Sequence, residues 1–181
     1  MPIKAFEDAK VRLAPALPAR ERAELARAMA ATVVAAAHDL PVSVVCDDHE
    51  VAAWAAAHGA DVILRPGRGL NGAVADGVDA LAAAGAARVI VAHADLPLAD
   101  DLRPVAAGFD GVTLVPDRRA DGTNVLCVPT GVGFVFQYGP RSFVRHREEA
   151  ERIGLACRVL EDARLAWDVD VPEDLRYPTC A

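Results

Sequence analysis

The sequence lacks the features that mark membrane-spanning, secreted and metal-stapled proteins. No run of about 18 residues is apolar and free of charge, so no segment is expected to cross a membrane as a helix. The amino-terminal stretch MPIKAFEDAKVRL has no uncharged apolar core of the kind found in signal peptides. The 4 cysteines include no C-x-x-C pair, which argues against a zinc site and a disulfide framework. We therefore expect a cytoplasmic protein.

Aromatic residues and excess positive charge are also scarce. Aromatics make up 5% of the 181 residues and the formal net charge is −7, so a broad basic face for a nucleic acid polymer is not expected. The hydrophobic fraction of 53% excludes a disordered chain and suits one domain over residues 1–181. A small anion can still bind where cations are grouped, as Lys4, Lys10 and Arg12 are.

The standard phosphate-binding and hydrolytic motifs are absent too. The chain contains no Walker A loop, no G-x-G-x-x-G and no G-x-S-x-G elbow. Hydride transfer and acyl transfer therefore have no supporting motif. The remaining hypothesis is metal-assisted chemistry on a phosphate or a nucleotide.

The first half of the chain alternates between short β-rich runs and alanine-rich helical runs. We expect strands at 2–5, 42–46, 61–65 and 88–92, helices at 19–38 and 71–84, and between these two a helix that runs through Ala57. Asp47 and Asp48 can cap the second helix, and Gly59 and Gly85 can end the second and third. This order predicts an α/β fold in which helices cover both faces of a mostly parallel sheet. Cys46 lies in an apolar run and is expected in the core.

The second half is richer in strands with short connections. Strands are expected at 111–116, 123–129, 134–139 and 157–160, and Ser142 is expected to cap a helix that runs to about Ile153. The chain closes with WDVDVPEDLRYP, which predicts a short strand and then a turn or short helix. These strands indicate either a β-rich extension or antiparallel edge strands added to the sheet. Cys127 lies in an apolar run and is expected in the core.

Three carboxylates occupy positions that suit a magnesium site. Asp95 follows the most apolar strand, and ligands of open α/β sheets sit beyond the carboxyl ends of the strands. Asp168 and Asp170, two residues apart on an extended segment, would point to the same face. Oxygen ligands of this kind bind Mg²⁺ together with substrate phosphates. Alternatively, Asp95 is a turn or helix-capping carboxylate, and the other two lie at a solvated strand end.

Four further segments could hold phosphate groups. Gly139 to Ser142 precede a helix, whose start offers N–H groups to an anion. Asp121 to Asn124, Gly67 to Asn71 and the basic loop from Lys4 to Arg12 also fit. Each has a simpler reading, as a helix cap, a DG turn, an ordinary glycine loop and solvated surface respectively.

Taken in order, these segments resemble a known family: the guanylyltransferases that activate the phospho-acid building block of the deazaflavin coenzyme F-420. The resembling segments cover nearly the whole chain and are Pro2-Ile3-Lys4, Ala9 to Leu13, Gly69 to Asn71, Ala94 to Pro97, Asp121 to Asn124, Tyr138 to Phe143 with His146, and Asp168 to Leu175.

The resemblance implies a three-layer, Rossmann-like α/β fold with a mixed, mostly parallel sheet of the nucleotide-diphospho-sugar transferase type. It implies transfer of GMP from GTP to phosphoenolpyruvate or 2-phospho-L-lactate, with Mg²⁺ as cofactor and pyrophosphate as product. The implied roles are metal binding and catalysis for Asp95, Asp168 and Asp170, binding of the phospho-acid for Thr123, Gly139 and Ser142, and nucleotide binding for Lys4, Lys10, Arg12, Gly69 and Asn71.

The sequence departs from that family at three places. Met1 stands almost directly before the Pro-x-Lys segment, where relatives have several apolar residues, so the first strand is expected to be short. Arg141 stands where glycine is common, and Cys46 where a small hydroxyl residue is common.

Two other functions fit the same residues. One is a nucleotidyltransferase acting on molybdopterin or a sugar phosphate, and the other is a nucleotide-binding domain without catalysis. The arginine-rich and alanine-rich composition resembles that of a high-GC genome and favours phosphoenolpyruvate as acceptor. The sequence leaves open whether the chain forms a homodimer.

Overall fold

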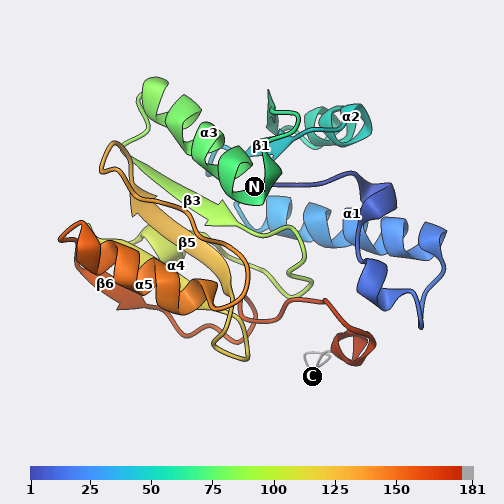
Figure 1. The fold of residues 1–181 in the computed structure, drawn as a ribbon. Coiled ribbons are helices and arrows are strands. Elements are labelled where there is room, and N and C mark those ends of the chain that lie inside the picture. Colours follow the sequence, from blue (N-terminus) through green and yellow to red (C-terminus); the bar gives the residue numbers. More distant parts are fainter. Residues whose placement is uncertain (177–181) are drawn as a thin grey trace.

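The computed structural model describes residues 1–176 and shows helices packed around mixed β-structure (Figure 1). The first half contains, in chain order, two 3-10 turns, η1 and η2, then helices and strands in alternation. Their bounds are η1 Phe6–Asp8, η2 Val11–Leu13, α1 Ala19–Ala35, β1 Ser43–Cys46, α2 His49–Ala57, β2 Asp61–Leu64, α3 Gly69–Ala83 and β3 Arg88–Ala92.

The second half adds a short helix, three strands and the helix that covers them. Its elements are α4 Arg103–Ala106, β4 Val112–Pro116, β5 Thr123–Pro129, α5 Ser142–Arg152, β6 Cys157–Val159 and the 3-10 turn η3 Pro172–Leu175. The strands pair in the order β3-β5-β4-β6, with β5 antiparallel to both neighbours and β6 parallel to β4. Strands β1 and β2 form a separate parallel pair.

The helix boundaries follow from the capping residues predicted above. The Asp48 carboxylate accepts a hydrogen bond from the Val51 N–H at 2.8 Å, which confirms Asp48 as the cap of α2. Gly59 and Gly85 have positive φ angles just beyond α2 and α3, where a residue with a Cβ would be strained. Helix α1 ends at Ala35, three residues before the predicted end, and α3 begins two residues early, at Gly69.

Two segments predicted as strands have no ladder of their own. Residues 2–5 contribute only a bridge between Pro2 and Val45. Residues 134–139 are extended, but their backbone donors bond to side chains: the N–H groups of Val135, Gln137 and Tyr138 donate to Glu149, His146 and Asn71. These side chains replace a neighbouring strand and satisfy the buried backbone. The segment before η3 is also not a strand, whereas α4 was not predicted.

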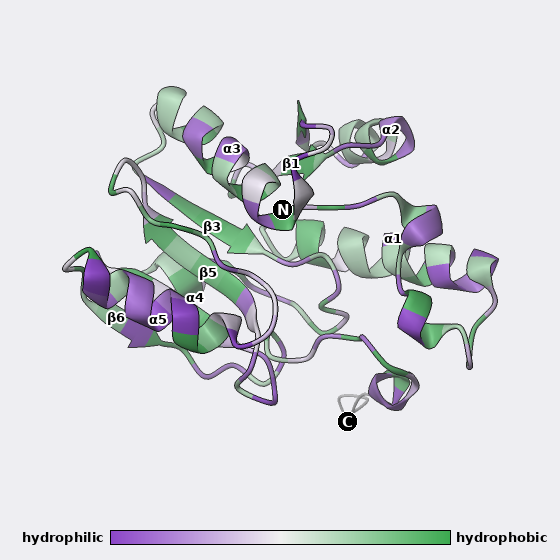
Figure 2. Ribbon diagram, viewed as in Figure 1, coloured by the Kyte–Doolittle hydropathy of each residue, from purple (hydrophilic) through white to green (hydrophobic). Residues whose placement is uncertain are grey.

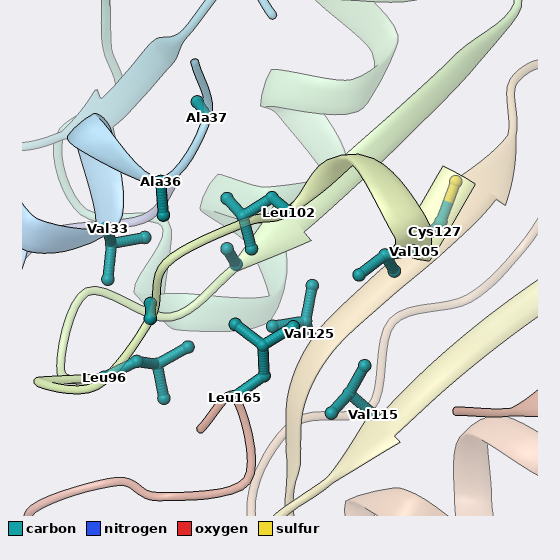
Figure 3. Packing of buried hydrophobic residues seen from close by; sticks show 12 residues of the cluster. Val33, Ala36, Ala37, Leu96, Leu102, Val105, Val115, Val125, Cys127 and Leu165 are labelled. Atoms are coloured by element: carbon teal, nitrogen blue, oxygen red, sulfur yellow. The ribbon is translucent and has the colours of Figure 1, made fainter. Parts of the chain in front are cut away.

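Alternating side chains of the sheet fill two hydrophobic clusters. On one face, Val125 and Cys127 of β5 pack with residues of α1 and α4, among them Val33 and Val105 (Figure 3). On the other face, Leu126 packs with residues of α3 and α5. Figure 2 shows the apolar strands β3 and β5 at the centre and the polar outer surface of α5. Cys46 and Cys127 are buried as predicted, and Cys180 lies outside the described residues.

An apolar slot of about 260 Å³ lies between β1 and β3. Its walls include Val45 of β1, Val89 and Val91 of β3, and Val74 of α3. Met1 and Pro2 are among the residues that line this slot. They are held beside β1 by hydrogen bonds from the Ile3 N–H to Val45 O, from the Val45 N–H to Met1 O, and from the Met1 amino group to Ser43 O, at 2.8–2.9 Å. Burial lowers the pKa of that amino group to about 5.

None of the helices within residues 1–176 is both long and apolar enough to cross a membrane.

Candidate active site

Asp95 lies in the loop that follows β3, as the sequence predicted. Leu96, the next residue, is fully buried and anchors the loop in the core. The Asp95 carbonyl accepts a hydrogen bond from the Val169 N–H at 3.3 Å, which joins this loop to the segment that carries Asp168 and Asp170. The fold thus brings together carboxylates that are more than 70 residues apart in the printed sequence.

The segment from Asp168 to Val171 is held in place by Asp174, whose carboxylate is almost fully buried. Asp174 accepts hydrogen bonds from the N–H groups of Asp170 and Val171 at 2.8 and 2.9 Å. It also pairs with Arg118 and Arg119 at 2.7 and 3.0 Å. Burial opposes its charge, but these hydrogen bonds outweigh burial and lower the pKa of Asp174 to about 2.

Lys10 connects the two carboxylate loops directly. Its Nζ lies 2.5 Å from Asp95 Oδ2 and 3.1 Å from Asp170 Oδ1, and its side chain is 11% exposed. The Arg12 guanidinium, 76% exposed, approaches the other Asp170 oxygen at 3.6 Å. The basic amino-terminal loop and the acidic segments therefore form one site.

The charges in this site shift one another's pKa values. Burial would lower the pKa of Lys10, but Asp95 and Asp170 outweigh it, and the net shift is upward. Burial would likewise raise the pKa of Asp95, but Lys10 reverses this and the net shift is downward. At Asp168 burial has the largest effect and the nearby Asp95 adds to it, and together they raise its pKa to about 6. A cation placed beside Asp168 would therefore stabilise its charged form, as Lys10 does for Asp95.

Four buried polar atoms around the site have no hydrogen-bond partner. They are Asp95 Oδ1, Asp168 Oδ1, His93 Nε2 and the Tyr138 hydroxyl. The ring centroids of His93 and Tyr138 are 5.0 Å apart. Because buried polar groups are normally paired, this concentration of unpaired atoms indicates a place where a ligand binds.

Thr123, the first residue of β5, contacts Ser142, the first residue of α5, and both are 2% exposed. The Ser142 hydroxyl oxygen accepts from the Thr123 N–H at 3.0 Å. His146 accepts from the Gln137 N–H through Nε2, so its Nδ1 carries the proton and donates to the Thr123 hydroxyl at 3.0 Å. Burial lowers the pKa of His146 to about 4, which keeps the ring neutral. Both hydroxyl oxygens are thus held as acceptors, and both hydroxyl protons stay free to donate.

The start of α5 is less open to an anion than the sequence suggested. The N–H groups of Arg141, Ser142 and Phe143 already donate to Asp121 or to the Gly139 carbonyl. Space does remain beside Gly139, because no heavy atom lies within 4 Å of where its Cβ would be. Arg141 is exposed and has a φ of 59°, a conformation that glycine adopts more readily.

The predicted nucleotide-binding residues occupy three different places. Lys4, Lys10 and Arg12 line a cavity of about 370 Å³ together with Asp95 and Asp170. Gly69 lines a smaller cavity of about 70 Å³, which also includes Lys4. Asn71 lines neither of these cavities: its side-chain amide pairs with the backbone of Tyr138 at 2.7 and 3.3 Å.

Asp95, Asp168 and Asp170 have the right chemistry for a hard divalent cation. They supply carboxylate oxygens, two of them buried and unpaired, beside a cavity lined by cations. As the side chains stand, no three His, Cys, Asp or Glu residues within 1–176 form a metal-binding group. The ammonium group of Lys10 takes the position between Asp95 and Asp170 instead.

Sequence reasoning missed the supporting roles of Asp174, Arg118 and His93. Asp174 belongs to the segment that resembles the family, and its place four residues after Asp170 suits a side chain that folds back onto the backbone. His93 stands two residues before Asp95, on the same loop. Arg118 gave no local signal, because its partners Asp168 and Asp174 are 50 or more residues away.

Three known proteins with similar sequences are guanylyltransferases named for different acceptors. A phosphoenolpyruvate guanylyltransferase from Sphaerobacter thermophilus is 35% identical over 97% of this chain and 88% of its own. A 3-phospho-D-glycerate guanylyltransferase from Phenylobacterium zucineum is 36% identical over 92% of this chain and 82% of its own. A 2-phospho-L-lactate guanylyltransferase from Methanocaldococcus fervens is 28% identical over 97% of this chain and 81% of its own.

The fold has a solved counterpart as well. A protein from Desulfovibrio desulfuricans G20 described as a nucleotide-diphospho-sugar transferase aligns with a TM-score of 0.73 at 18% identity, over 96% of this chain and 82% of its own. This confirms the expected fold class. The family model described as "Guanylyl transferase CofC like" matches residues 1–177. The chain therefore belongs to the CofC-like guanylyltransferase family.

Proposed function

We propose that this protein transfers GMP from GTP to phosphoenolpyruvate, or to 2-phospho-L-lactate, and releases pyrophosphate as a step in coenzyme F-420 biosynthesis. The observation that carries the proposal is the joint site in which Lys10 contacts Asp95 and Asp170 beside a cavity lined by Lys4 and Arg12. Such a site combines cations for a triphosphate with carboxylates for a metal ion. The relatives named as phosphoenolpyruvate guanylyltransferases favour that acceptor.

In the proposed reaction, an oxygen of the acceptor phosphate forms a bond to the α-phosphorus of GTP. The bond between that phosphorus and the oxygen bridging to the β-phosphate breaks, and pyrophosphate leaves with this oxygen. A phosphate is already a nucleophile near neutral pH, so no strong general base is needed. The protein contributes chiefly by positioning the reactants and by neutralising charge.

The amino-terminal loop supplies the positive charge for the triphosphate. Lys4, Lys10 and Arg12 line one side of the cavity of about 370 Å³. Lys10 is the most enclosed of the three. Its side chain is 11% exposed, against 76% for Arg12, and Lys4 is also exposed. A charge held in such a partly dry site acts more strongly than one in water.

The acceptor phosphate is proposed to lie beside Gly139, where Thr123 and Ser142 can donate hydrogen bonds. Both hydroxyl oxygens already accept hydrogen bonds from internal donors, so each hydroxyl proton can donate to a bound phosphate oxygen. Neutral His146 fixes the Thr123 hydroxyl in this role.

Magnesium is the cofactor that fits the carboxylates. Asp95, Asp168 and Asp170 would hold it through hard oxygen ligands. When bound, it supplies a positive centre that withdraws charge from the phosphate oxygens of the reacting groups. The raised pKa of Asp168 and the unpaired oxygens of Asp95 and Asp168 support this assignment.

An assay of pyrophosphate release tests the function. The purified chain is incubated with GTP and Mg²⁺, and phosphoenolpyruvate, 2-phospho-L-lactate and 3-phospho-D-glycerate are each added in parallel. The proposal predicts release that needs one of the first two acceptors and falls when ATP replaces GTP. Pyrophosphate release only with 3-phospho-D-glycerate would contradict the proposed acceptors and leave guanylyl transfer as the reaction. GTP binding without release with any acceptor would contradict the proposal.

A further inference from the structure

The site holds a positive charge of its own before any metal ion is bound. The Lys10 ammonium lies between Asp95 and Asp170, at 2.5 and 3.1 Å, and 11% of its side chain is exposed. The side chain reaches this place from a residue with φ 56° and ψ 38°, a left-handed conformation that non-glycine residues adopt uncommonly. The amino-terminal loop is therefore folded so that this side chain lies on the carboxylates.

These carboxylates need a cation for the site to be stable. Asp95 and Asp170 both contact the same ammonium group, so their two negative charges lie close together. Lys10 neutralises part of this charge, but two carboxylate oxygens stay buried and unpaired. A divalent cation between the same carboxylates would meet the Lys10 ammonium at short range, and two such charges repel strongly in a partly dry site.

We propose that Lys10 is a tethered cation that holds the place of the metal ion between Asp95 and Asp170, and that it must leave these carboxylates when a divalent cation binds. This inference rests on the proposed function, because it takes the three carboxylates as the metal ligands. Lys10 also lines the cavity of about 370 Å³, so its side chain has open space into which it can turn. Once it leaves the carboxylates, the Lys10 ammonium would lie in the cavity that Lys4 and Arg12 line, where the triphosphate is proposed to bind.

The chain makes this movement directly observable, because Lys4 and Lys10 are its only lysines. Labelling lysine with ¹³C at Cε therefore gives two signals in an NMR spectrum of the unaltered protein. During titration with Mg²⁺ alone, without nucleotide, the Lys10 signal should shift and sharpen as the ion pairs break. The Lys4 signal, which has no carboxylate partner among the described residues, should move little. A Lys10 signal that stays unchanged while Mg²⁺ saturates the protein would overturn the proposal.

A pair of variants tests the competition from the metal side. Mn²⁺ serves as a paramagnetic hard cation, and its dissociation constant is measured by electron paramagnetic resonance without nucleotide. Lys10→Met should bind Mn²⁺ roughly 5- to 100-fold more tightly than the unaltered chain, the usual range for coupling between two ligands. Arg20→Met removes the same charge from a side chain that is 90% exposed and should leave the constant unchanged. Equal or weaker Mn²⁺ binding by Lys10→Met would contradict the proposal.

Lys10→Arg separates charge from size. It keeps a cation on the loop, so its Mn²⁺ affinity should return toward that of the unaltered chain. None of these measurements requires turnover. If the chain released no pyrophosphate with any acceptor, yet Mg²⁺ displaced Lys10, the proposed function would fail and this inference would stand. If the chain turned over its substrates and Mg²⁺ left Lys10 in place, the proposed function would stand and this inference would fail.

Discussion

At the scale of single residues, the sequence singled out three carboxylates that the fold brings together, but not the lysine that contacts two of them. Asp95 could be selected because it follows the most apolar strand, a position where α/β folds place ligands. Lys10 could be assigned to a basic loop, but its contacts with Asp95 and Asp170 span 85 and 160 residues of sequence. No local pattern reports contacts across such separations. Asn71 shows the converse, because its amide is occupied by the Tyr138 backbone.

Asp95→Asn should reduce pyrophosphate release by roughly a hundredfold or more, as loss of a charged group in a catalytic site commonly does. The substitution removes a carboxylate that faces Lys10 and lies beside the cavity, while the side chain keeps its size. Steady-state rates with GTP and phosphoenolpyruvate measure the effect. Asp79→Asn makes the same chemical change on the exposed side of α3 and should leave the rate unchanged. Turnover of Asp95→Asn close to that of the unaltered chain would show that the Asp95 carboxylate is not needed for the reaction.

Asp168 gives a pH dependence of stability with a defined sign. Its pKa is about 6 in the folded chain, above the usual value of 3.8, so the folded state binds this proton more tightly than the unfolded state does. The group therefore favours folding below pH 3.8, and this contribution is lost as the pH rises through 6. Asp168→Asn cannot ionise and should be more stable than the unaltered chain at pH 7, on the order of 2 kcal/mol.

Urea unfolding in the presence of a chelator measures this difference at several pH values. The advantage of Asp168→Asn should shrink steadily between pH 7 and pH 4. A difference that does not change with pH would show that Asp168 is not held with a raised pKa.

At the scale of helices and strands, the pattern of the chain predicted most elements, and the exceptions have a common cause. Residues 134–139 alternate like a strand, yet their N–H groups bond to side chains of α3 and α5. A sequence pattern shows that a segment is extended and half-buried, but not which partner satisfies its backbone. The same limit applies to residues 2–5, which align on β1 with a single bridge.

The packing of α3 on β1 depends on Gly77. A Cβ at this position would lie 2.6 Å from Val45 Cγ2, too close for two carbon atoms. Gly77→Ala should therefore destabilise the fold by about 1–3 kcal/mol, the usual effect of overpacking. Gly72→Ala is the matched change on the same helix, and its nearest neighbours belong to the mostly exposed Arg68 side chain. It should be neutral or gain up to about 1 kcal/mol from helix propensity. Equal unfolding midpoints for the two variants would contradict this account of the packing.

At the scale of the whole molecule, the order of helices and strands was enough to predict a layered α/β fold. The sequence could not show how the strands group. The pair β1-β2 and the four strands β3-β5-β4-β6 are separate groups in the described part of the chain, and the apolar slot of about 260 Å³ lies between them. Strand pairing between distant segments depends on the complete set of neighbours, which local patterns do not contain.

The slot is lined by the first two residues of the chain and by side chains of β1 and β3. Residues Met1 to Ile3 run parallel to β1 through a single bridge, and the Met1 amino group donates to Ser43 O. A chain extended by Val-Val-Val-Ile ahead of Met1 should extend this pairing with β1, bury apolar side chains against Val89 and Val91, and turn a buried amine into an amide. A control extended by Gly-Ser-Gly-Ser gains none of that apolar burial.

Each buried side chain adds about 1.5–3 kcal/mol before the loss of conformational entropy is subtracted. The net gain expected from the apolar extension is on the order of 2–4 kcal/mol, which for a chain of this size raises the melting temperature by roughly 5–15 °C. Differential scanning calorimetry of the two extended chains measures the difference. Because both lose the free amine at Met1, only filling of the slot separates them. Equal melting temperatures would show that the space between β1 and β3 does not accept a strand.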